Sequence, residues 1–105
     1  PYSDPIADGP VIQASYKRAL PKKIKLQEIF DQFRQLSRQV SMPLATMVSY
    51  AVIHRVGLER YVDQAIAAGF AGAIVPDLLI EESDALAKVC ATRDFNLIQL
   101  VTPTT

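Results

Sequence analysis

The chain has 105 residues, of which 50% are hydrophobic and 21% charged, so we expect a single domain with one modest core. Eleven basic side chains balance eleven acidic ones, and this neutral balance argues against a nucleic-acid partner or a membrane surface as partner. A single cysteine excludes an intrachain disulfide and favours a cytoplasmic location, and no apolar run approaches the roughly 18 residues that a membrane span needs.

The first ten residues are predicted to form a stiff loop that leads into a helix. Three prolines restrict the backbone and remove amide donors, so neither a strand nor a helix interior fits this segment. Asp8-Gly9 is a turn pair, and Pro10 suits the first position of a helix. A carboxylate on such a loop is well placed for acid–base chemistry, with capping of the helix as the competing interpretation of Asp8.

Two helices are predicted next. The first begins at Pro10 and is broken at residues 20–23, where a basic cluster indicates a solvated helix end rather than an anion site. The second begins at Leu26 and carries its apolar stripe as far as Val40. Two phenylalanines on this stripe, Phe30 and Phe33, indicate core packing rather than an aromatic ligand box.

Three strands are predicted over residues 44–50, 71–75 and 97–101. The first is a short, largely apolar run typical of a strand buried on both faces. Residues 51–56 are predicted to be a loop, and residues 57–69 a helix. Its inward positions are expected to be Leu58, Tyr61, Val62, Ala65 and Ile66.

Another helix is predicted between the second and third strands. Its first turn contains Glu81, Glu82 and Asp84, where the helix dipole favours acidic side chains. Cys90 lies on its apolar face without a motif around it, and we interpret it as a small core residue. The single histidine, His54, has no second His or Cys at ligand spacing, so no metal site is expected, and we assign it to packing of the loop.

Strands separated by single helices predict a parallel sheet with right-handed crossovers, either in a barrel or in an open doubly wound sheet. Polar or conformationally special residues follow the predicted strands. The carboxyl ends of parallel strands meet at one edge of the sheet, and both the barrel and the doubly wound sheet build their ligand sites at that edge. These residues are Ser49 and Tyr50, Pro76 and Asp77, and Thr102 and Thr104.

Residues 1–13, Pro-Tyr-Ser-Asp-Pro-Ile-Ala-Asp-Gly-Pro-Val-Ile-Gln, resemble the signature loop of the tryptophan synthase α subunit family. Three later segments resemble that family in the same order, at residues 56–61, 74–78 and 100–104. The resemblance implies the α/β class and a (β/α)₈ TIM barrel. Such a barrel takes about 250 residues, so residues 1–105 are expected to be a single incomplete domain, roughly two-fifths of one. It would run from the catalytic loop after the second strand through the fifth strand.

The resemblance also implies a reaction in tryptophan biosynthesis, the cleavage of indole-3-glycerol phosphate to indole and glyceraldehyde 3-phosphate. The α subunit uses no cofactor of its own, because the pyridoxal phosphate belongs to the partner β subunit of an α2β2 heterotetramer. Asp8 matches the family's catalytic aspartate, which accepts the indole N–H proton. Four positions match or adjoin the lining of the indole pocket: Met47, Ser49, Pro76 and Leu100. Asp4 and Pro5 match loop positions that contact the β subunit.

Two segments depart from the family pattern. Ser49-Tyr50-Ala51 stands where most members carry Tyr-Tyr-Asn or Tyr-Ala-Asn, and residues 77–79 lack a usual proline. The family's second catalytic carboxylate and its phosphate site lie outside this sequence, so we expect the 105 residues alone to be inactive. Two other functions stay open: a non-catalytic docking or activating partner of a β subunit, and a different phosphate-binding barrel enzyme, against which the first loop argues.

Overall fold

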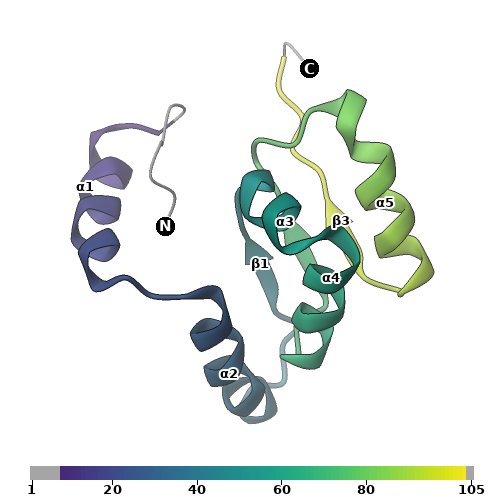
Figure 1. Cartoon of the computed structure of the whole chain (residues 1–105), viewed down its shortest axis with the longest axis horizontal. Helices are drawn as coiled ribbons and strands as arrows, with labels where there is room; N and C mark the ends of the chain where they lie inside the picture. The colour runs from purple at the N-terminus through teal and green to yellow at the C-terminus, as the bar shows by residue number, and fades with distance from the viewer. Residues whose placement is uncertain (1–7, 104–105) are drawn as a thin grey trace.

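The computed structural model describes residues 8–103, which form a three-stranded parallel sheet with helices on one face (Figure 1). The sheet has the order β1-β2-β3 and consists of β1 (Ala45–Met47), β2 (Gly72–Ile74) and β3 (Asn96–Ile98). Both neighbouring pairs are parallel, with Ile74 of β2 opposite Met47 on one side and Ile98 on the other. The predicted alternation of parallel strands and helices is therefore confirmed.

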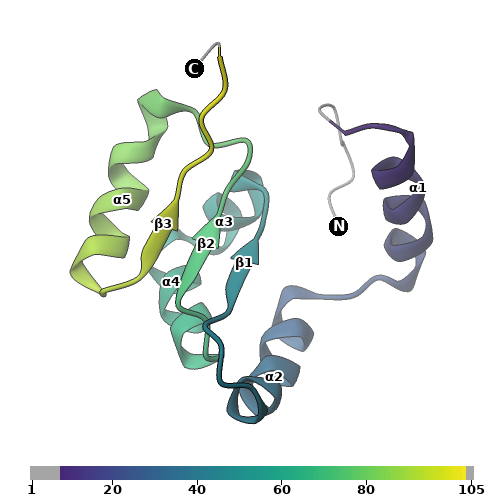
Figure 2. The same cartoon turned by 180° about the vertical axis from the view of Figure 1, so that it is seen from behind.

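The helices lie before and between the strands. They are α1 (Pro10–Ala19), η1 (Leu20–Lys22), α2 (Leu26–Leu36), η2 (Ser37–Gln39), α3 (Tyr50–Val56), α4 (Leu58–Ala67), η3 (Ile80–Glu82) and α5 (Ser83–Thr92). Helices α4 and α5 cover one face of the sheet, and Figure 2 shows the strands from the other, uncovered side. Helix α1 stands apart from the sheet in both views and has no buried residue.

The core lies between the sheet and its helices. Phe30 of α2 packs with its ring centroid 5.6 Å from that of Tyr61 in α4. The Tyr61 hydroxyl donates a hydrogen bond of 3.1 Å to Oγ1 of Thr46, and this bond joins the buried ring to β1. Cys90 of α5 is 2% exposed. The predicted core roles of Phe30 and Cys90 are confirmed.

Helix α4 ends in a Schellman motif. Gly69, at φ 97°, donates its amide to the carbonyl of Ile66 at 2.9 Å. The next amide, that of Phe70, donates to the carbonyl of Ala65 at 3.0 Å. Only glycine takes this left-handed conformation without a steric cost, which explains why the helix ends at Gly69, as the sequence predicted. The motif satisfies the last helix carbonyls and leads into β2.

Helix α5 ends in the same way, with Asp94 at φ 53° in place of glycine. The Phe95 amide donates to the Cys90 carbonyl at 2.9 Å, and the Asp94 amide donates to Ala91 at 3.4 Å. In each case the residue after the left-handed position is a buried phenylalanine, which anchors the turn in the core. The connections from α4 to β2 and from α5 to β3 therefore have the same turn geometry.

Two expectations about the elements are wrong. Residues 51–56 are not a loop, because they belong to helix α3. Strand β1 is not buried on both faces: Met47 is 69% exposed, because the described residues cover only one face of the sheet.

Several predicted boundaries also differ. The three strands are each three residues long, and the second helix ends at Leu36, with Val40 in extended backbone beyond it. Ile66 was expected to face inward in α4 but is 41% exposed, because the sheet and α5 pack against the side of α4 that carries Tyr61, Val62 and Ala65.

Candidate functional site

The uncovered face of the sheet carries side chains in aligned rows. The register places Met47, Ile74 and Ile98 side by side across the three strands. Because side chains alternate along a strand, Thr46 and Leu97 lie on the opposite face, toward the helices. The exposure pattern agrees, since the outer residues of β1 and β3 are exposed and their central residues are partly buried.

Three of the predicted pocket residues follow this row in the chain. Ser49, Pro76 and Leu100 each come two residues after a member of the row and lie beyond the carboxyl ends of the strands, with Ser49 as the N-cap residue of α3 and Pro76 in a turn. Met47 lies within the row itself. The four positions predicted to line a substrate pocket therefore lie in or just after three neighbouring strands, at the carboxyl edge of the sheet.

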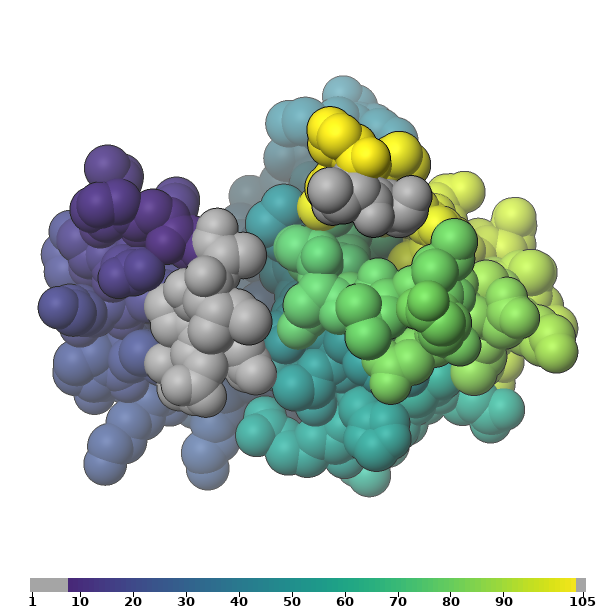
Figure 3. Space-filling model, turned by 90° about the horizontal axis from the view of Figure 1, so that it is seen from above, coloured from purple at the N-terminus to yellow at the C-terminus, as the bar shows by residue number. Residues whose placement is uncertain are grey.

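Pro76 and Leu100 also line a hollow of about 260 Å³ at this edge. It lies between the segment after β2, the start of α5 and the end of β3. Figure 3 shows these segments from above, with the segment after β2 and the start of α5 in green and the residues after β3 in yellow. Most of its lining is apolar, and the Ser83 hydroxyl is already engaged, because it donates to the Ile80 carbonyl at 2.8 Å. Such a lining suits an aromatic or aliphatic group better than a charged one.

Asp77 joins the loops that follow β1 and β2. Its Oδ2 accepts a hydrogen bond from the Ser49 hydroxyl, and its Oδ1 accepts one from the Tyr50 amide, both at 2.7 Å. The Ser49 Oγ in turn accepts from the Ala51 amide at 3.3 Å. These bonds satisfy amides at the start of α3 and hold a negative charge where the helix dipole favours it. The sequence placed Asp77 after a strand but gave no signal for its partners, which lie 27 and 28 positions away.

Asp8 lies two residues before α1 and is partly buried. The N-cap residue of α1 is Gly9, and no side chain accepts a capping hydrogen bond, so the capping interpretation of Asp8 is wrong. The backbone carbonyl of Asp8 accepts from Nε2 of Gln13 at 2.8 Å. In Figures 1 and 2 the amino end of α1 lies at the same end of the molecule as the carboxyl ends of the strands. Asp4 and Pro5 lie outside the described residues.

The predicted place of His54 in a loop is wrong, because His54 belongs to helix α3. It is exposed on α3, with its ring centroid 6.0 Å from that of Tyr50. Within residues 8–103, no group of three or more His, Cys, Asp or Glu side chains is arranged to hold a metal ion. A search of the same residues finds no helix with the length and apolar character needed to cross a membrane.

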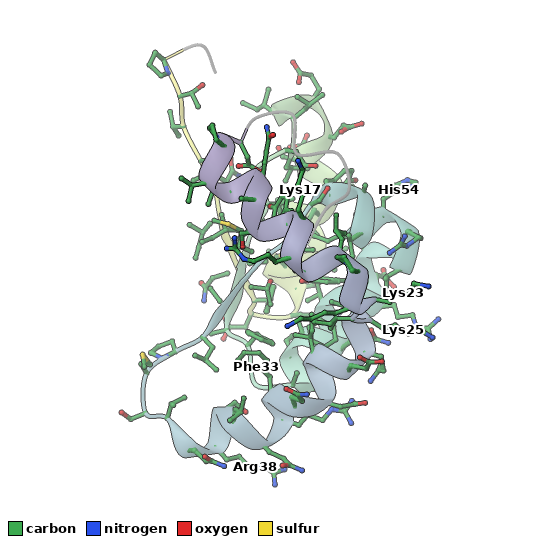
Figure 4. The ribbon with its side chains drawn as sticks, turned by 90° about the vertical axis from the view of Figure 1, so that its left-hand side faces the viewer. Lys17, Lys23, Lys25, Phe33, Arg38 and His54 are labelled. Atoms are coloured by element: carbon green, nitrogen blue, oxygen red, sulfur yellow. The ribbon has the colours of Figure 1, made fainter. Side chains whose placement is uncertain are left out.

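The basic residues near the end of α1 are all exposed: Lys17, Arg18, Lys22, Lys23 and Lys25. Figure 4 shows Lys17 on α1, with Lys23 and Lys25 beyond its carboxyl end on the link to α2. Cations at a helix carboxyl end are favoured by the dipole, as expected of a solvated helix end.

Residues 1–105 match the protein family described as Tryptophan synthase alpha chain. The tryptophan synthase alpha chain of Rhodopirellula baltica is 59% identical over 108 residues, and that of Synechocystis sp. is 45% identical over 104. The alignments cover 100% and 99% of this chain but only 39% of each relative. The chain thus spans about two-fifths of the length of the curated relatives it matches.

Solved structures show the same relationship. The tryptophan synthase complex from Pyrococcus furiosus contains a chain that matches with a TM-score of 0.92 and 34% identity, over 100% of this chain and 43% of that one. A second structure, of the a2b2 complex from the same organism, matches with the same score and covers 45% of its chain. The expected partial (β/α)₈ barrel is confirmed, and the open doubly wound sheet is excluded. With its whole length matched in sequence and in fold, this chain belongs to the tryptophan synthase alpha chain family.

Proposed function

We propose that the protein to which this chain belongs cleaves indole-3-glycerol phosphate to indole and glyceraldehyde 3-phosphate, as a lyase of tryptophan biosynthesis. Membership of the family supports the pathway. The observation that carries the proposal is the meeting, at the carboxyl edge of the parallel sheet, of the segments that carry Met47, Ser49, Pro76 and Leu100. A largely apolar wall at that edge fits the flat indole ring.

Asp8 is the proposed catalytic carboxylate. Protonation of indole C3 places positive charge on the ring nitrogen, and the Asp8 carboxylate stabilises that charge by accepting the N–H proton. When the bond between C3 and the glycerol side chain then breaks, its electron pair returns to the ring and the nitrogen takes the proton back, while the side-chain hydroxyl loses its proton and becomes the aldehyde. A fixed carboxylate is effective in this role because it needs no reorganisation at the moment of reaction. Its support here is the position of Asp8, just ahead of α1 and not engaged in the cap of that helix.

The proposed partner is a tryptophan synthase β subunit in an α2β2 assembly, with Asp4 and Pro5 as contact residues and with pyridoxal phosphate held by the partner alone. Structures described as tryptophan synthase complexes are among the relatives of this fold. We further propose a cytoplasmic location, which suits the free, buried thiol of Cys90.

Residues 1–105 would form one incomplete barrel domain that is inactive by itself. They supply one catalytic carboxylate, whereas the family's second carboxylate and phosphate site have no counterpart in this sequence. Activity is therefore proposed for the full-length parent only.

The test is an assay of the purified full-length parent with indole-3-glycerol phosphate, in which released indole is measured. We expect cleavage above the uncatalysed background without any β subunit, and faster cleavage when a β subunit is added. A parent that releases no indole but still stimulates a β subunit would instead be a docking and activating partner, the second candidate function.

A further inference from the structure

The carboxylate of Asp77 forms a clamp between the two loops that carry Ser49 and Pro76. One oxygen accepts from the Ser49 hydroxyl and the other from the Tyr50 amide, each at 2.7 Å. Hydrogen bonds to an ionised acceptor are short and about twice as strong as neutral ones. With both oxygens engaged, the side chain of Asp77 is held in one orientation.

The clamp also fixes what Ser49 can offer to a ligand. Its hydroxyl proton points to Asp77, and one of its lone pairs accepts from the Ala51 amide. A hydroxyl has a single proton to donate, so Ser49 cannot also donate to a substrate while the clamp is closed. Ser49 therefore shapes the wall through the position of its Cβ and backbone.

Pro76 directly precedes Asp77 in the chain, so the clamp ties this residue to Ser49 in the segment that follows the neighbouring strand β1. Beyond the last paired residues of β1 and β2, the Val48 amide still donates to the Ile74 carbonyl at 3.1 Å. Past that point, the two bonds to Asp77 connect the loops across the edge of the sheet.

We propose that Asp77 is a positioning residue, which sets the distance and orientation between the Ser49 and Pro76 parts of the indole-binding wall. This inference rests on the proposed function of the full-length protein. Asp77 acts through the wall and touches no reacting atom, so it should govern how tightly the indole ring is held rather than the chemical step.

The test uses three variants of the full-length parent: Asp77→Ala, Asp77→Asn and, as a matched control, Glu81→Ala. Glu81 is an exposed carboxylate four residues further along, with no hydrogen bond or ion pair among the described residues. Asp77→Ala removes both acceptors, whereas Asp77→Asn keeps one oxygen for the Tyr50 amide.

We expect Asp77→Ala to raise KM for indole-3-glycerol phosphate about tenfold, while kcat stays within about threefold of the wild-type value. This pattern is expected when a variant loses binding energy that the substrate and the transition state both receive from the enzyme. The Asn variant should be intermediate, and Glu81→Ala should match the wild type. Hydrogen–deuterium exchange at the Tyr50 amide should accelerate in Asp77→Ala and not in Glu81→Ala.

Each outcome decides between the two proposals. A wild-type parent that cleaves substrate, with Asp77→Ala indistinguishable from Glu81→Ala in KM, overturns the positioning role alone. Accelerated exchange at Tyr50 with an unchanged KM shows a clamp that is purely structural, and also overturns it. A wild-type parent that releases no indole overturns the proposed function and the positioning role with it.

Discussion

Asp8, the proposed catalytic carboxylate, and Cys90 lie in opposite surroundings. Asp8 is partly buried ahead of α1, where its backbone carbonyl is held by Gln13. Cys90 is sealed in the core, where burial raises the pKa of its thiol. Burial thus suppresses the thiolate form of Cys90.

For Asp8, the Asn variant of the full-length parent should lower turnover by about 10²-fold or more, because asparagine cannot accept the proton. Single-turnover release of indole measures the effect. Asp84→Asn, which changes an exposed carboxylate in α5, serves as the control and should be close to wild type. An Asp8→Asn enzyme with a near wild-type rate would remove Asp8 from the reaction.

For Cys90, we expect slow modification by a thiol reagent in the folded parent. The raised pKa leaves less thiolate at neutral pH, and burial hinders access of the reagent. Unfolding in urea should accelerate labelling of Cys90 by about 10²-fold, as read by mass spectrometry of that peptide. Equal rates in the folded and unfolded protein would show that the thiol is exposed.

At the scale of elements, helix α3 shows where the sequence alone falls short. Residues 51–56 contain two valines and an isoleucine, which are weak helix formers, so the sequence pattern predicts a loop. The helix nevertheless begins after Ser49, whose hydroxyl accepts from the Ala51 amide, and Asp77 adds a bond to the Tyr50 amide from across the sheet edge. Serine is a preferred N-cap residue, so this local signal was present in the sequence, whereas the contribution of Asp77 has no local signature.

Other elements could be predicted because their signals are local. Gly57 and Gly69 bracket α4 in the sequence and do so in the structure. For the candidate site, the positions of Ser49 and Pro76 after their strands were visible in the sequence, and the resemblance assigned them to a pocket. The strand register, which brings the segments of Ser49 and Pro76 side by side, could not be read from the sequence because it depends on pairing between distant segments.

The geometry of the turn after α4 leads us to predict how a substitution there changes the stability of the protein. A Cβ at Gly69 would collide with the side chain of Ser37, and the φ of 97° is unfavourable for any L side chain. Gly69→Ala should therefore destabilise the full-length parent by more than about 1 kcal/mol. Gly9→Ala is the matched control, since its Cβ would meet open space and its φ is −80°. Urea unfolding midpoints measure both, and equal midpoints would contradict the turn geometry.

At the scale of the whole molecule, the sheet has one covered and one uncovered face within residues 8–103. Apolar side chains remain exposed on and beyond the strands: Met47 at 69%, Leu100 at 51% and Val101 at 84%. Apolar surface of this extent is normally covered by other parts of a protein. The relatives, in which this segment is about two-fifths of the chain, supply such parts as the remainder of the barrel.

We therefore expect residues 1–105, produced alone, to lack a sharp cooperative melt and to bind a hydrophobic dye. The reason is the combination, within residues 8–103, of exposed apolar side chains with unpaired edges on β1 and β3. Circular dichroism during heating, with dye fluorescence alongside, measures both properties, and the full-length parent is the control. A single steep transition without dye binding would contradict the expectation.

The repeated Schellman turns have a practical consequence for engineering. Each one fixes the entry of the next strand from the amino-terminal side of the sheet, with a phenylalanine as its anchor. Extra residues grafted after β1 or β2, on the opposite side, would leave strand pairing undisturbed. The scaffold can thus accept longer loops at that edge, provided that the bonds of Asp77 to Ser49 and Tyr50 are kept, whereas a residue inserted at Gly69 or Asp94 would break the turn and displace the strand that follows.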